Sequence, residues 1–195
     1  MYVSCLLIKS IIYKFLFISM VLLKLNLFIL YNLYSLKLIN VRRKIGMGKY
    51  YFKNDTRLSN YYMCNVKIDN LTFSSSECAY HAEKFLDEDI KKLLTKLIPD
   101  EAKHVTRELS RFIRLDWDNV KYNLMKKVVL EKFKQNPKCL KELLDTEDIE
   151  LIEDTTGWHD NIWGECTCEE CKNKEHKNYL GKILMEVRNE LKNYY

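Results

Sequence analysis

The first 46 residues of this 195-residue chain contain no Asp or Glu, although they hold five Lys and two Arg. The whole chain has 32 basic and 27 acidic residues, so the rest of it holds 25 basic and 27 acidic residues, a net charge of −2. Proteins that bind nucleic acid without sequence preference need a basic surface. The charge balance therefore excludes that class for residues 47–195 and leaves nucleic acid only as a modified substrate. A local basic patch could still hold a small phosphate-bearing ligand.

The chain also lacks the signs of a secreted or repetitive protein. No small-residue cleavage site follows the apolar N-terminus, which argues against a removed signal peptide. Residues 49–195 contain no internal repeat and no low-complexity linker. The seven cysteines do not form a disulfide framework, because four are scattered singly and three cluster within residues 166–171. This distribution is typical of a reducing compartment, and we expect a cytoplasmic protein.

Residues 1–46 form an apolar, basic leader, and its densest apolar run is Phe15–Leu36. These 22 residues could span a bilayer, and the basic residues after them would then keep the following domain cytoplasmic. Lys24 within the run costs about 2.5–3.5 kcal/mol on membrane insertion, although the neighbouring Leu and Ile offset it. Three interpretations stay open: a non-structural leader with translation starting at Met47, a membrane tether, and a helix packed on the domain.

Residues 47–195 are enough for one well-cored domain and few for two. Their pattern predicts a single α+β domain that is predominantly helical and has a small β-sheet. Short β-favouring runs predict strands over residues 50–52, 66–73 (two strands around an Asp-Asn turn) and 149–153. Apolar periodicity, capping residues and prolines predict helices over residues 74–97, from 99 onward, and over 117–134, 137–144 and 178–192.

A loop of about two dozen residues, 154–177, lies between the last predicted strand and the last helix. Loops of this length inside compact domains are uncommon and are usually functional or disordered. This loop holds two tryptophans, Trp158 and Trp163, as well as the cysteine cluster. The tryptophans favour an ordered, functional loop.

A crowded polar stripe marks the helix that starts near Ser74. At 100° per residue, one face gathers Glu77, Tyr80, His81 and Lys84, and the opposite face is small or apolar. One face can therefore be buried while the other gathers ionisable groups. A structural explanation competes with a catalytic one, because Ser74 and Glu77 fit the S-x-x-E capping box, in which the glutamate satisfies a free N–H at the helix start.

A collinear series of short motifs runs through residues 50–191. It includes Leu58-Ser59-Asn60-Tyr61, Ser75-Ser76-Glu77-x-Ala79-Tyr80, Lys84-Phe85, Arg114-x-Asp116-Trp117-Asp118, Lys132-Phe133, Asn136-Pro137, Glu153, Asp160-x-x-Trp163-Gly164 and Asn178-x-Leu180-Gly181. No single motif is diagnostic, but the ordered set resembles the NADAR, or YbiA-like, family of N-glycosidases. The sequence departs from that pattern at Thr106, where Gly is common, and at the insert Cys166–Cys171, where shorter members are glycine-rich.

The resemblance implies a small α+β hydrolase that cleaves an N-glycosidic bond between a ribosyl carbon and a nitrogen, with no required cofactor. Activities known in the family are the hydrolysis of early phosphorylated riboflavin-pathway intermediates, which releases ribose 5-phosphate, and the removal of ADP-ribose from guanine in DNA. The expected partner is accordingly a phosphorylated ribosyl amine or an ADP-ribosyl compound. A non-catalytic module that binds ADP-ribose or a nucleotide is the alternative from another class.

Cleavage of an N-glycoside requires stabilisation of positive charge on the sugar carbon and help for the departing nitrogen. We expect Glu77 and Asp160 to be the two carboxylates involved. Lys84 could attack the anomeric carbon, or trap the opened sugar as a Schiff base, if burial lowers its pKa; a salt bridge to a surface acid is its alternative role. His81 fits a hydrogen-bonding neighbour better than a direct catalyst.

Aromatic side chains are candidates for holding the base of the substrate. Tyr61, Trp117 and Trp163 could stack on it, and such stacking is worth about 1–3 kcal/mol per base. Asn60 could hydrogen-bond a base edge or a hydroxyl group. Trp117 begins a long helix and could instead anchor the core, so Trp163 on the loop is the better ligand candidate.

Two arginines, Arg107 and Arg114, are candidates for a phosphate site, because a guanidinium group binds phosphate through two parallel hydrogen bonds. Either could instead cap a helix or pair with Asp116.

The insert provides candidate metal ligands. Cys166, Cys168 and Cys171 are followed five residues later by His176, and such a Cys₃His set could hold a structural zinc ion that fastens the loop. The tight C-x-C spacing is unusual for a zinc finger, so reduced thiols or a fortuitous cysteine-rich insert stay open as alternatives.

Overall fold

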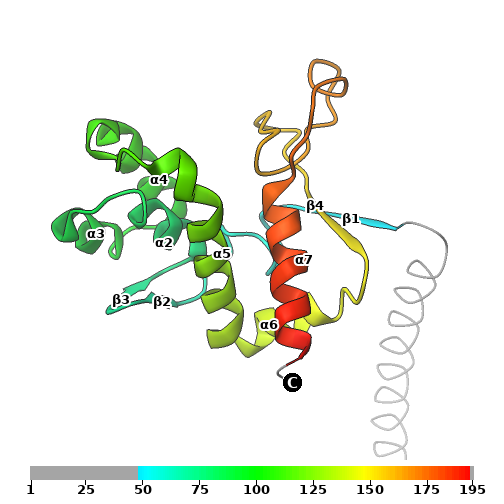
Figure 1. The fold of residues 1–195 in the computed structure, drawn as a ribbon, viewed down its shortest axis with the longest axis horizontal. Coiled ribbons are helices and arrows are strands. Elements are labelled where there is room, and N and C mark those ends of the chain that lie inside the picture. The colour runs from blue at the N-terminus through cyan, green and yellow to red at the C-terminus, as the bar shows by residue number, and fades with distance from the viewer. Residues whose placement is uncertain (1–47, 194–195) are drawn as a thin grey trace, which may run out of the picture. The chain divides into compact units, whose positions relative to one another are not determined.

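The computed structural model describes residues 48–193 (Figure 1). The interpretations of the leader, including the run 15–36, lie outside the described residues. Within 48–193, no helix is long and apolar enough to cross a membrane. The elements in chain order are β1 (Lys49–Phe52), β2 (Val66–Ile68), β3 (Leu71–Phe73), α2 (Ser76–Ala82), α3 (Glu88–Leu94), α4 (Pro99–Glu108), η1 (Ser110–Phe112), α5 (Trp117–Gln135), α6 (Pro137–Leu144), β4 (Glu150–Glu153) and α7 (Tyr179–Lys192).

The α+β class is confirmed, but the strands form two small sheets within the described residues where the sequence predicted one. β1 and β4 pair in parallel, with Lys49 opposite Glu150 and Phe52 opposite Glu153. β2 and β3 form an antiparallel hairpin around the predicted Asp-Asn turn, where Asp69 adopts a positive φ of 51°. Asp tolerates this left-handed conformation better than most residues, which explains its place in the turn.

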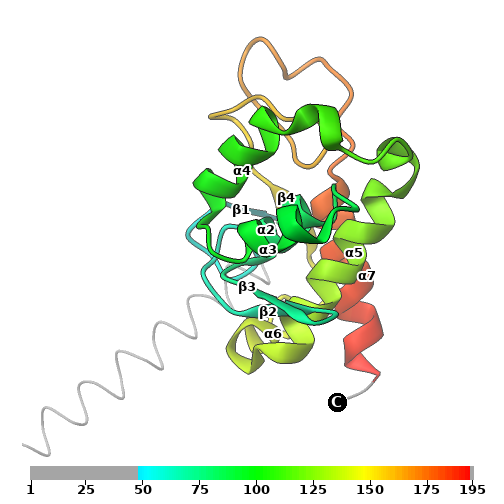
Figure 2. The same ribbon diagram turned by 90° about the vertical axis from the view of Figure 1, so that its left-hand side faces the viewer.

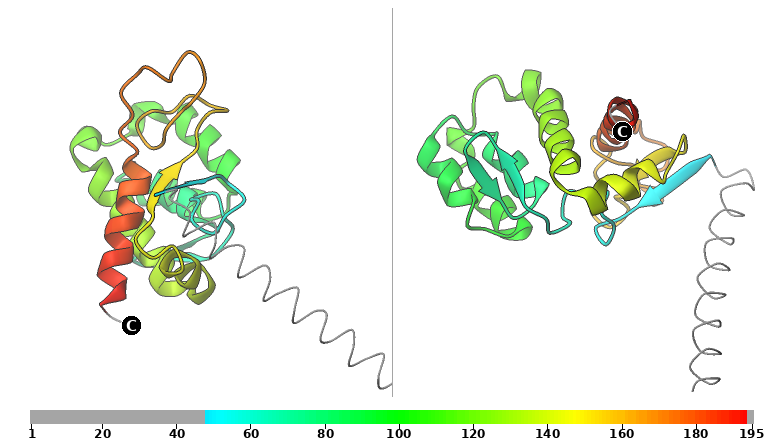
Figure 3. Two further views of the ribbon diagram at one scale, coloured as in Figure 1. Left: turned by 90° about the vertical axis from the view of Figure 1, so that its right-hand side faces the viewer. Right: turned by 90° about the horizontal axis from the view of Figure 1, so that it is seen from below.

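Helix α5 lies between the two halves of the core (Figures 1 and 3). Met125, Val129 and Phe133 follow one another at intervals of four residues and pack in a cluster with residues of α6, α7, β1 and β4. Val128 faces another cluster, formed with the hairpin, α2 and α3. A helix buried on two sides has no single apolar face, and truncating a central side chain such as Phe133 to Ala should cost about 3–5 kcal/mol.

Helix α7 packs directly on strand β4. A Cβ added to Gly181 would lie 2.0 Å from the carbonyl oxygen of Leu151, so only glycine permits this close approach. Asn178 supports the same contact, because its Nδ2 donates to Leu151 O at 2.8 Å and its Oδ1 accepts from Glu153 N at 3.3 Å. These contacts fix the end of β4 against the start of α7.

The chain between β4 and α7 forms the predicted long loop, without helix or strand between Asp154 and Asn178. It extends beyond the N-terminal end of α7 (Figures 1 and 2). An isolated bridge between Asp154 and Glu165 folds its first half back on β4. Gly164 makes this return possible, because a Cβ there would lie 2.4 Å from Glu153 O.

Candidate active site

A cavity of about 440 Å³ brings together side chains from distant parts of the chain. Its volume falls in the range of small-molecule sites. The lining residues are Asn54, Asn60, Tyr61, Glu77, Tyr80, His81, Lys84, Asp100, Lys103, Met125, Glu153, Trp158, Asp160, Trp163 and Leu180. Seven of the ten residues predicted for catalysis or substrate binding are therefore part of one cavity.

Helix α2 presents Glu77 to this cavity, and the predicted capping box is wrong. Ser75, not Ser74, is the N-cap, and its hydroxyl accepts from Cys78 N at 3.2 Å. Ser74 Oγ donates to Leu97 O, and the Glu77 side chain instead lies 3.2 Å from His81 Nε2. Moving the helix start by one residue rotates Glu77 away from the capping position, so its carboxylate faces the cavity.

His81 is held at both ring nitrogens. Its Nε2 is 3.2 Å from Glu77 Oε1, and its Nδ1 is 2.9 Å from Thr106 Oγ1. Burial lowers the pKa of His81, and the charges of Lys84 and Lys103 lower it further, although Glu77 opposes them. A neutral imidazole can donate to Glu77 and accept from Thr106, so His81 orients the carboxylate.

Lys84 follows α2 and lies between two aromatic rings. Its Nζ is 5.6 Å from the ring centroid of Tyr80 and 5.4 Å from that of Trp117. Within the described residues no carboxylate is close enough to form a salt bridge with it, which argues against the surface ion pair considered above. Burial lowers the pKa of Lys84, and the charges of Lys103 and Arg107 act in the same direction while Glu77 opposes them.

Glu153, at the end of β4, is the functional candidate that the sequence analysis missed. Burial raises its pKa from the usual value to about 8, with additional contributions from the charges of Glu77 and Asp160. Its backbone is fixed because Glu165 N donates to Glu153 O at 2.8 Å. Glu153 belongs to the motif series, but a glutamate at a strand end shows no sign of its burial in sequence.

Asp160 and Trp163 enter the cavity from the long loop. Asp160 Oδ1 accepts from Ile162 N at 2.8 Å and from Trp163 N at 3.0 Å, so one carboxylate oxygen shapes the turn. No described residue donates to the other oxygen, Oδ2, at hydrogen-bond distance. Trp163 packs edge-on against Tyr80 and Tyr179, with centroids 5.4 and 5.9 Å apart. The loop is thus ordered at the cavity by both polar and aromatic contacts.

Asn60 and Tyr61 lie on the loop that supports the start of α2. Asn60 is buried, and its Oδ1 accepts from Ser76 Oγ at 3.0 Å while its backbone oxygen accepts from Glu77 N. The fully buried Lys132 anchors this loop by donating to Ser59 O at 2.5 Å. Asn60 therefore fixes Glu77 as well as lining the cavity.

Three predicted substrate contacts are absent from the cavity lining. Arg114 donates from Nε and Nη2 to the two carboxylate oxygens of Asp116, at 2.6 and 2.9 Å. Only its backbone reaches the site, where its N–H donates to Lys84 O. Trp117 packs behind Tyr80, with the ring centroids 5.2 Å apart. Arg107 is exposed on α4. For Arg114, the structure therefore has the alternative role, an ion pair with Asp116, in place of the predicted phosphate contact.

The lining of the cavity is richer in acids than in bases. Its carboxyl groups are Glu77, Asp100, Glu153 and Asp160, and its amines are Lys84 and Lys103. Such a surface suits a group that becomes positively charged during reaction, whereas a ligand with several phosphates would meet repulsion. Helix α4 contributes Asp100 and Lys103 to the cavity lining. The sequence did not predict this contribution, because charged residues at these positions are typical of any solvent-exposed helix face.

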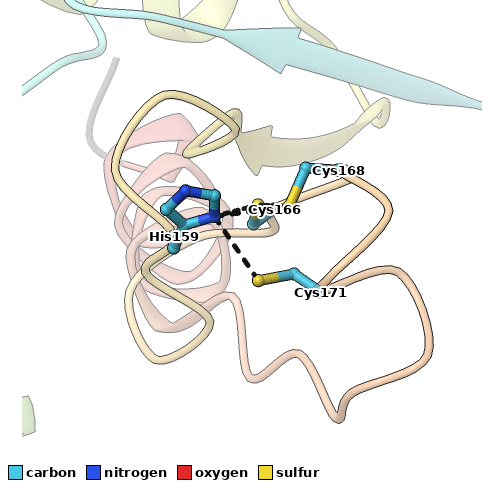
Figure 4. A group of neighbouring side chains, drawn as sticks. All are labelled: His159, Cys166, Cys168 and Cys171. Atoms are coloured by element: carbon cyan, nitrogen blue, oxygen red, sulfur yellow. Dashed lines mark hydrogen bonds between the residues drawn. The ribbon is translucent and has the colours of Figure 1, made fainter.

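The cysteine cluster lies beside the cavity, but with a different histidine from the one predicted. His159, Cys166, Cys168 and Cys171 bring their ligand atoms within 4.8 Å of one another, a group that could hold a metal ion (Figure 4). His176 lies outside this group, and its Nδ1 is 3.1 Å from Asn161 Oδ1. The prediction for His176 is wrong because the loop folds back on β4 and brings the earlier histidine to the thiols.

Comparison with known proteins agrees with this architecture. The NADAR domain profile matches residues 49–192. A riboflavin biosynthesis protein of Vibrio vulnificus is 33% identical over 160 residues, which cover 80% of this chain and 42% of that protein. The N-glycosidase YbiA of Shigella boydii is 34% identical over 134 residues, covering 68% of this chain and 79% of YbiA. The chain thus matches less than half the length of the Vibrio protein.

A solved structure shares the fold as well. The NMR structure of the E. coli protein YbiA has 30% sequence identity and a TM-score of 0.65, covering 75% of this chain and 86% of YbiA. The family profile spans most of the chain, and both sequence and fold relate it to YbiA. The chain therefore belongs to the NADAR domain family.

Proposed function

We propose that this chain hydrolyses the N-glycosidic bond of a phosphoribosyl amine, such as an early riboflavin-pathway intermediate, and releases ribose 5-phosphate. The observation that carries the proposal is a cavity that brings Glu77, Lys84 and Glu153 together. Burial raises the pKa of Glu153 to about 8 in this cavity. A carboxylic acid that keeps its proton at neutral pH can protonate a departing nitrogen.

The class of enzyme rests on family membership. The chain is an N-glycosidase of the NADAR family, and relatives at about 34% identity carry that name. A riboflavin biosynthesis protein among the relatives supports the choice of substrate. The chain matches only part of that protein, so the substrate itself belongs to the proposal.

The proposed bond cleavage uses Glu153 as the acid. Its proton passes to the leaving nitrogen as the C1′–N bond breaks and the electron pair of that bond stays on nitrogen. Glu77, oriented by His81, stabilises the positive charge that develops on C1′. The second cavity carboxylate, Asp160, adds to the same negative potential through its free oxygen.

Lys84 provides the proposed nucleophile. Its pKa is lowered by burial, which increases the fraction of neutral amine, and no carboxylate holds it in a salt bridge within residues 48–193. Attack of Nζ on C1′ gives a sugar–lysine adduct. Water then hydrolyses the C1′–Nζ bond, which releases ribose 5-phosphate and restores the amine. Direct attack by water is the alternative route.

The remaining lining residues suit the other parts of such a substrate. Tyr61, Trp158 and Trp163 offer aromatic faces for the base-like ring. Lys103 is the lining amine on α4, and Arg107 lies one turn farther along the same helix, so the phosphate is proposed to bind at this edge. Because Lys84 is assigned to the sugar carbon, Lys103 is the lining amine left for phosphate among the described residues, which matches one phosphate better than the diphosphate of ADP-ribose.

The proposal is tested by product analysis. The full chain is incubated separately with a phosphoribosyl aminopyrimidine and with ADP-ribosylated guanine in DNA, and the products are separated by chromatography. We expect ribose 5-phosphate from the first substrate and slower turnover of the second. Product from the ADP-ribosylated base alone would favour that activity instead. Tight ADP-ribose binding by calorimetry with no product from either substrate would favour a binding module.

Borohydride addition during turnover tests the lysine route. Reduction of an imine between Lys84 and the opened sugar would leave a stable adduct, detectable by mass spectrometry as added mass on the peptide that contains Lys84. The Lys84→Ala variant is the control. Turnover without any trapped adduct in the wild type would favour direct attack by water.

A further inference from the structure

We propose that His159, Cys166, Cys168 and Cys171 bind one zinc ion, and that this ion fastens the loop 154–177 that forms one wall of the cavity. The proposal stands on the positions of the four ligand atoms (Figure 4). It is independent of the proposed reaction, because metal content is measured without any substrate.

The distances among the ligand atoms fit a single tetrahedral ion. His159 Nδ1 is 3.5 Å from Cys166 Sγ, 3.3 Å from Cys168 Sγ and 3.6 Å from Cys171 Sγ. The sulfur atoms of Cys166 and Cys168 are 3.3 Å apart. With Zn–S of about 2.3 Å and Zn–N of about 2.1 Å, a tetrahedron has S···N edges of about 3.6 Å and S···S edges of about 3.8 Å. The three S···N distances thus differ from the ideal edges by about 0.3 Å or less and the Cys166–Cys168 distance by about 0.5 Å. The remaining sulfur–sulfur distances lie within 4.8 Å.

The donor types select zinc among the common metals. Three thiolates and an imidazole in a tetrahedral arrangement are the ligands of a structural zinc site, whereas calcium and magnesium require oxygen. An iron–sulfur cluster would distribute its ligands over separate iron atoms, and here all four ligand atoms lie within 4.8 Å of one another. Four protein ligands also leave no open position, so the ion is structural and not catalytic.

The backbone presents the four ligands from two turns and from the residue that follows a β-bridge. His159 has a positive φ of 59°, and its N–H donates to Thr155 O at 2.8 Å, which closes the first turn. Cys166 follows the bridge at Glu165. Cys171 N donates to Cys168 O at 3.0 Å, which closes the turn that carries the last two ligands. These local hydrogen bonds bring the ligands together although the loop has no helix or strand of its own.

The site lies next in sequence to residues of the cavity. Trp158 and Asp160 flank His159, and both line the cavity. Trp163 lies between Asp160 and the first cysteine ligand. Zinc binding would therefore restrict the positions of all three cavity residues, because a long loop without helix or strand loses much conformational entropy on ordering.

Metal analysis of the full chain tests the proposal. The protein is purified without chelator, and its zinc and iron are measured by inductively coupled plasma mass spectrometry. We expect about one zinc per chain in the wild type, as four protein ligands give high affinity. Less than about one tenth of an equivalent after addition of zinc and removal of the excess would overturn the proposal, as would stoichiometric iron.

Two histidine variants identify the ligand. His159→Ala should lose most of the zinc, whereas His176→Ala, a matched change in the same loop, should keep it. Loss from His176→Ala with retention by His159→Ala would contradict the assignment. If His159→Ala fails to fold, the absorption spectrum of the cobalt-substituted wild type still tests the thiolate site. We expect intense sulfur-to-metal charge-transfer bands and tetrahedral d–d bands. An octahedral spectrum without sulfur bands would refute a thiolate site.

Discussion

The cavity has two walls of different construction. The helical wall, formed by residues 75–84, comprises α2 with its N-cap and the turn that follows it. It rests on buried side chains on one face and on hydrogen bonds to Asn60 and Thr106 on the other. The loop wall, formed by Trp158, Asp160 and Trp163, belongs to a segment without helix or strand. The first wall is ordered by the core of the domain, and the second depends on local turns and, in our proposal, on a metal ion.

The contrast assigns different tasks to the walls. Glu77 and Lys84 are held in fixed positions by the packed helical wall. Such rigidity suits groups that must be placed accurately against the anomeric carbon. The loop wall contributes aromatic faces to the site, where variation of the insert could alter the choice of base without disturbing those two groups. Substitutions in the two walls should therefore have different kinetic consequences.

The largest expected effect comes from Glu77. Glu77→Gln should lower kcat for ribose 5-phosphate release by about 10³-fold, because the amide cannot stabilise positive charge on the sugar. Asp160→Asn, the matched change in the loop wall, should cost only about 10-fold, since one of its oxygens is engaged in the turn. Initial rates at saturating substrate measure both. Equal losses would mean that the chemistry is shared between the walls.

The lining acid Glu153, at the end of β4, should give a characteristic pH dependence. Glu153 has a folded-state pKa of about 8 against an ordinary value of 4.5, so kcat should fall as the pH rises through 8. Glu153→Gln should lose about 10²-fold at pH 7 and lack this alkaline decline. A wild-type rate that stays constant from pH 7 to 9.5 would contradict the role of Glu153.

The same carboxyl group should affect stability in a defined window. Between pH 4.5 and 8 the unfolded chain releases this proton while the folded chain retains it, so this residue's contribution to stability falls as pH rises. Glu153→Gln should therefore be more stable than the wild type by about 1–3 kcal/mol at pH 8, and by less at pH 5. Urea unfolding at the two pH values measures the difference. A gain that is larger at pH 5 would contradict the assignment.

Metal removal should act on the loop wall alone. Treatment with a strong chelator should raise KM by about 10-fold and change kcat less, because aromatic and polar contacts to the substrate loosen while Glu77 and Lys84 stay in place. Hydrogen exchange should increase within residues 154–177 and stay unchanged in α2. Faster exchange in both walls would show that they are coupled.

The smallest effect is expected at Arg114. Its side chain forms an exposed ion pair with Asp116, and only its backbone contacts Lys84. Arg114→Ala should change kcat/KM by less than about 2-fold and stability by less than about 1 kcal/mol. Lys103→Ala, which removes a lining amine, is the comparison and should raise KM for the phosphorylated substrate by about 10-fold. A larger loss of kcat/KM for Arg114→Ala than for Lys103→Ala would support the original prediction that the Arg114 guanidinium group binds the phosphate.

The two walls also differ in how well sequence reasoning predicted them. The helix starts at Pro99 and Pro137 follow from proline geometry, and the structure has them. The predicted helix over residues 74–97 is interrupted, because α2 ends at Ala82 and α3 begins at Glu88. Three members of the predicted polar stripe, Glu77, Tyr80 and His81, lie on α2, whereas Lys84 follows it. The hairpin formed by β2 and β3 was also predicted from neighbouring residues, the two short strands and the Asp-Asn turn between them. These features depend on residues a few positions apart, which the sequence displays directly.

What the sequence could not provide depends on distant contacts. The importance of Glu153 comes from burial beside Glu77 and Asp160, which are 76 and 7 residues away along the chain. The choice of His159 over His176 follows from the bridge between Asp154 and Glu165, which folds the loop back. The sequence spacing favoured His176, which follows the cysteines. Because the loop folds back on β4, His159, which precedes them, lies beside the thiols instead.

The proposed roles of Glu77 and Glu153 are tested most directly by the rate of ribose 5-phosphate release from a phosphoribosyl aminopyrimidine at pH 7, measured side by side for the wild type, Glu77→Gln and Glu153→Gln. We predict turnover by the wild type and losses of about 10³-fold and 10²-fold in the two variants, with unchanged circular dichroism. Full turnover by both folded variants would contradict these roles.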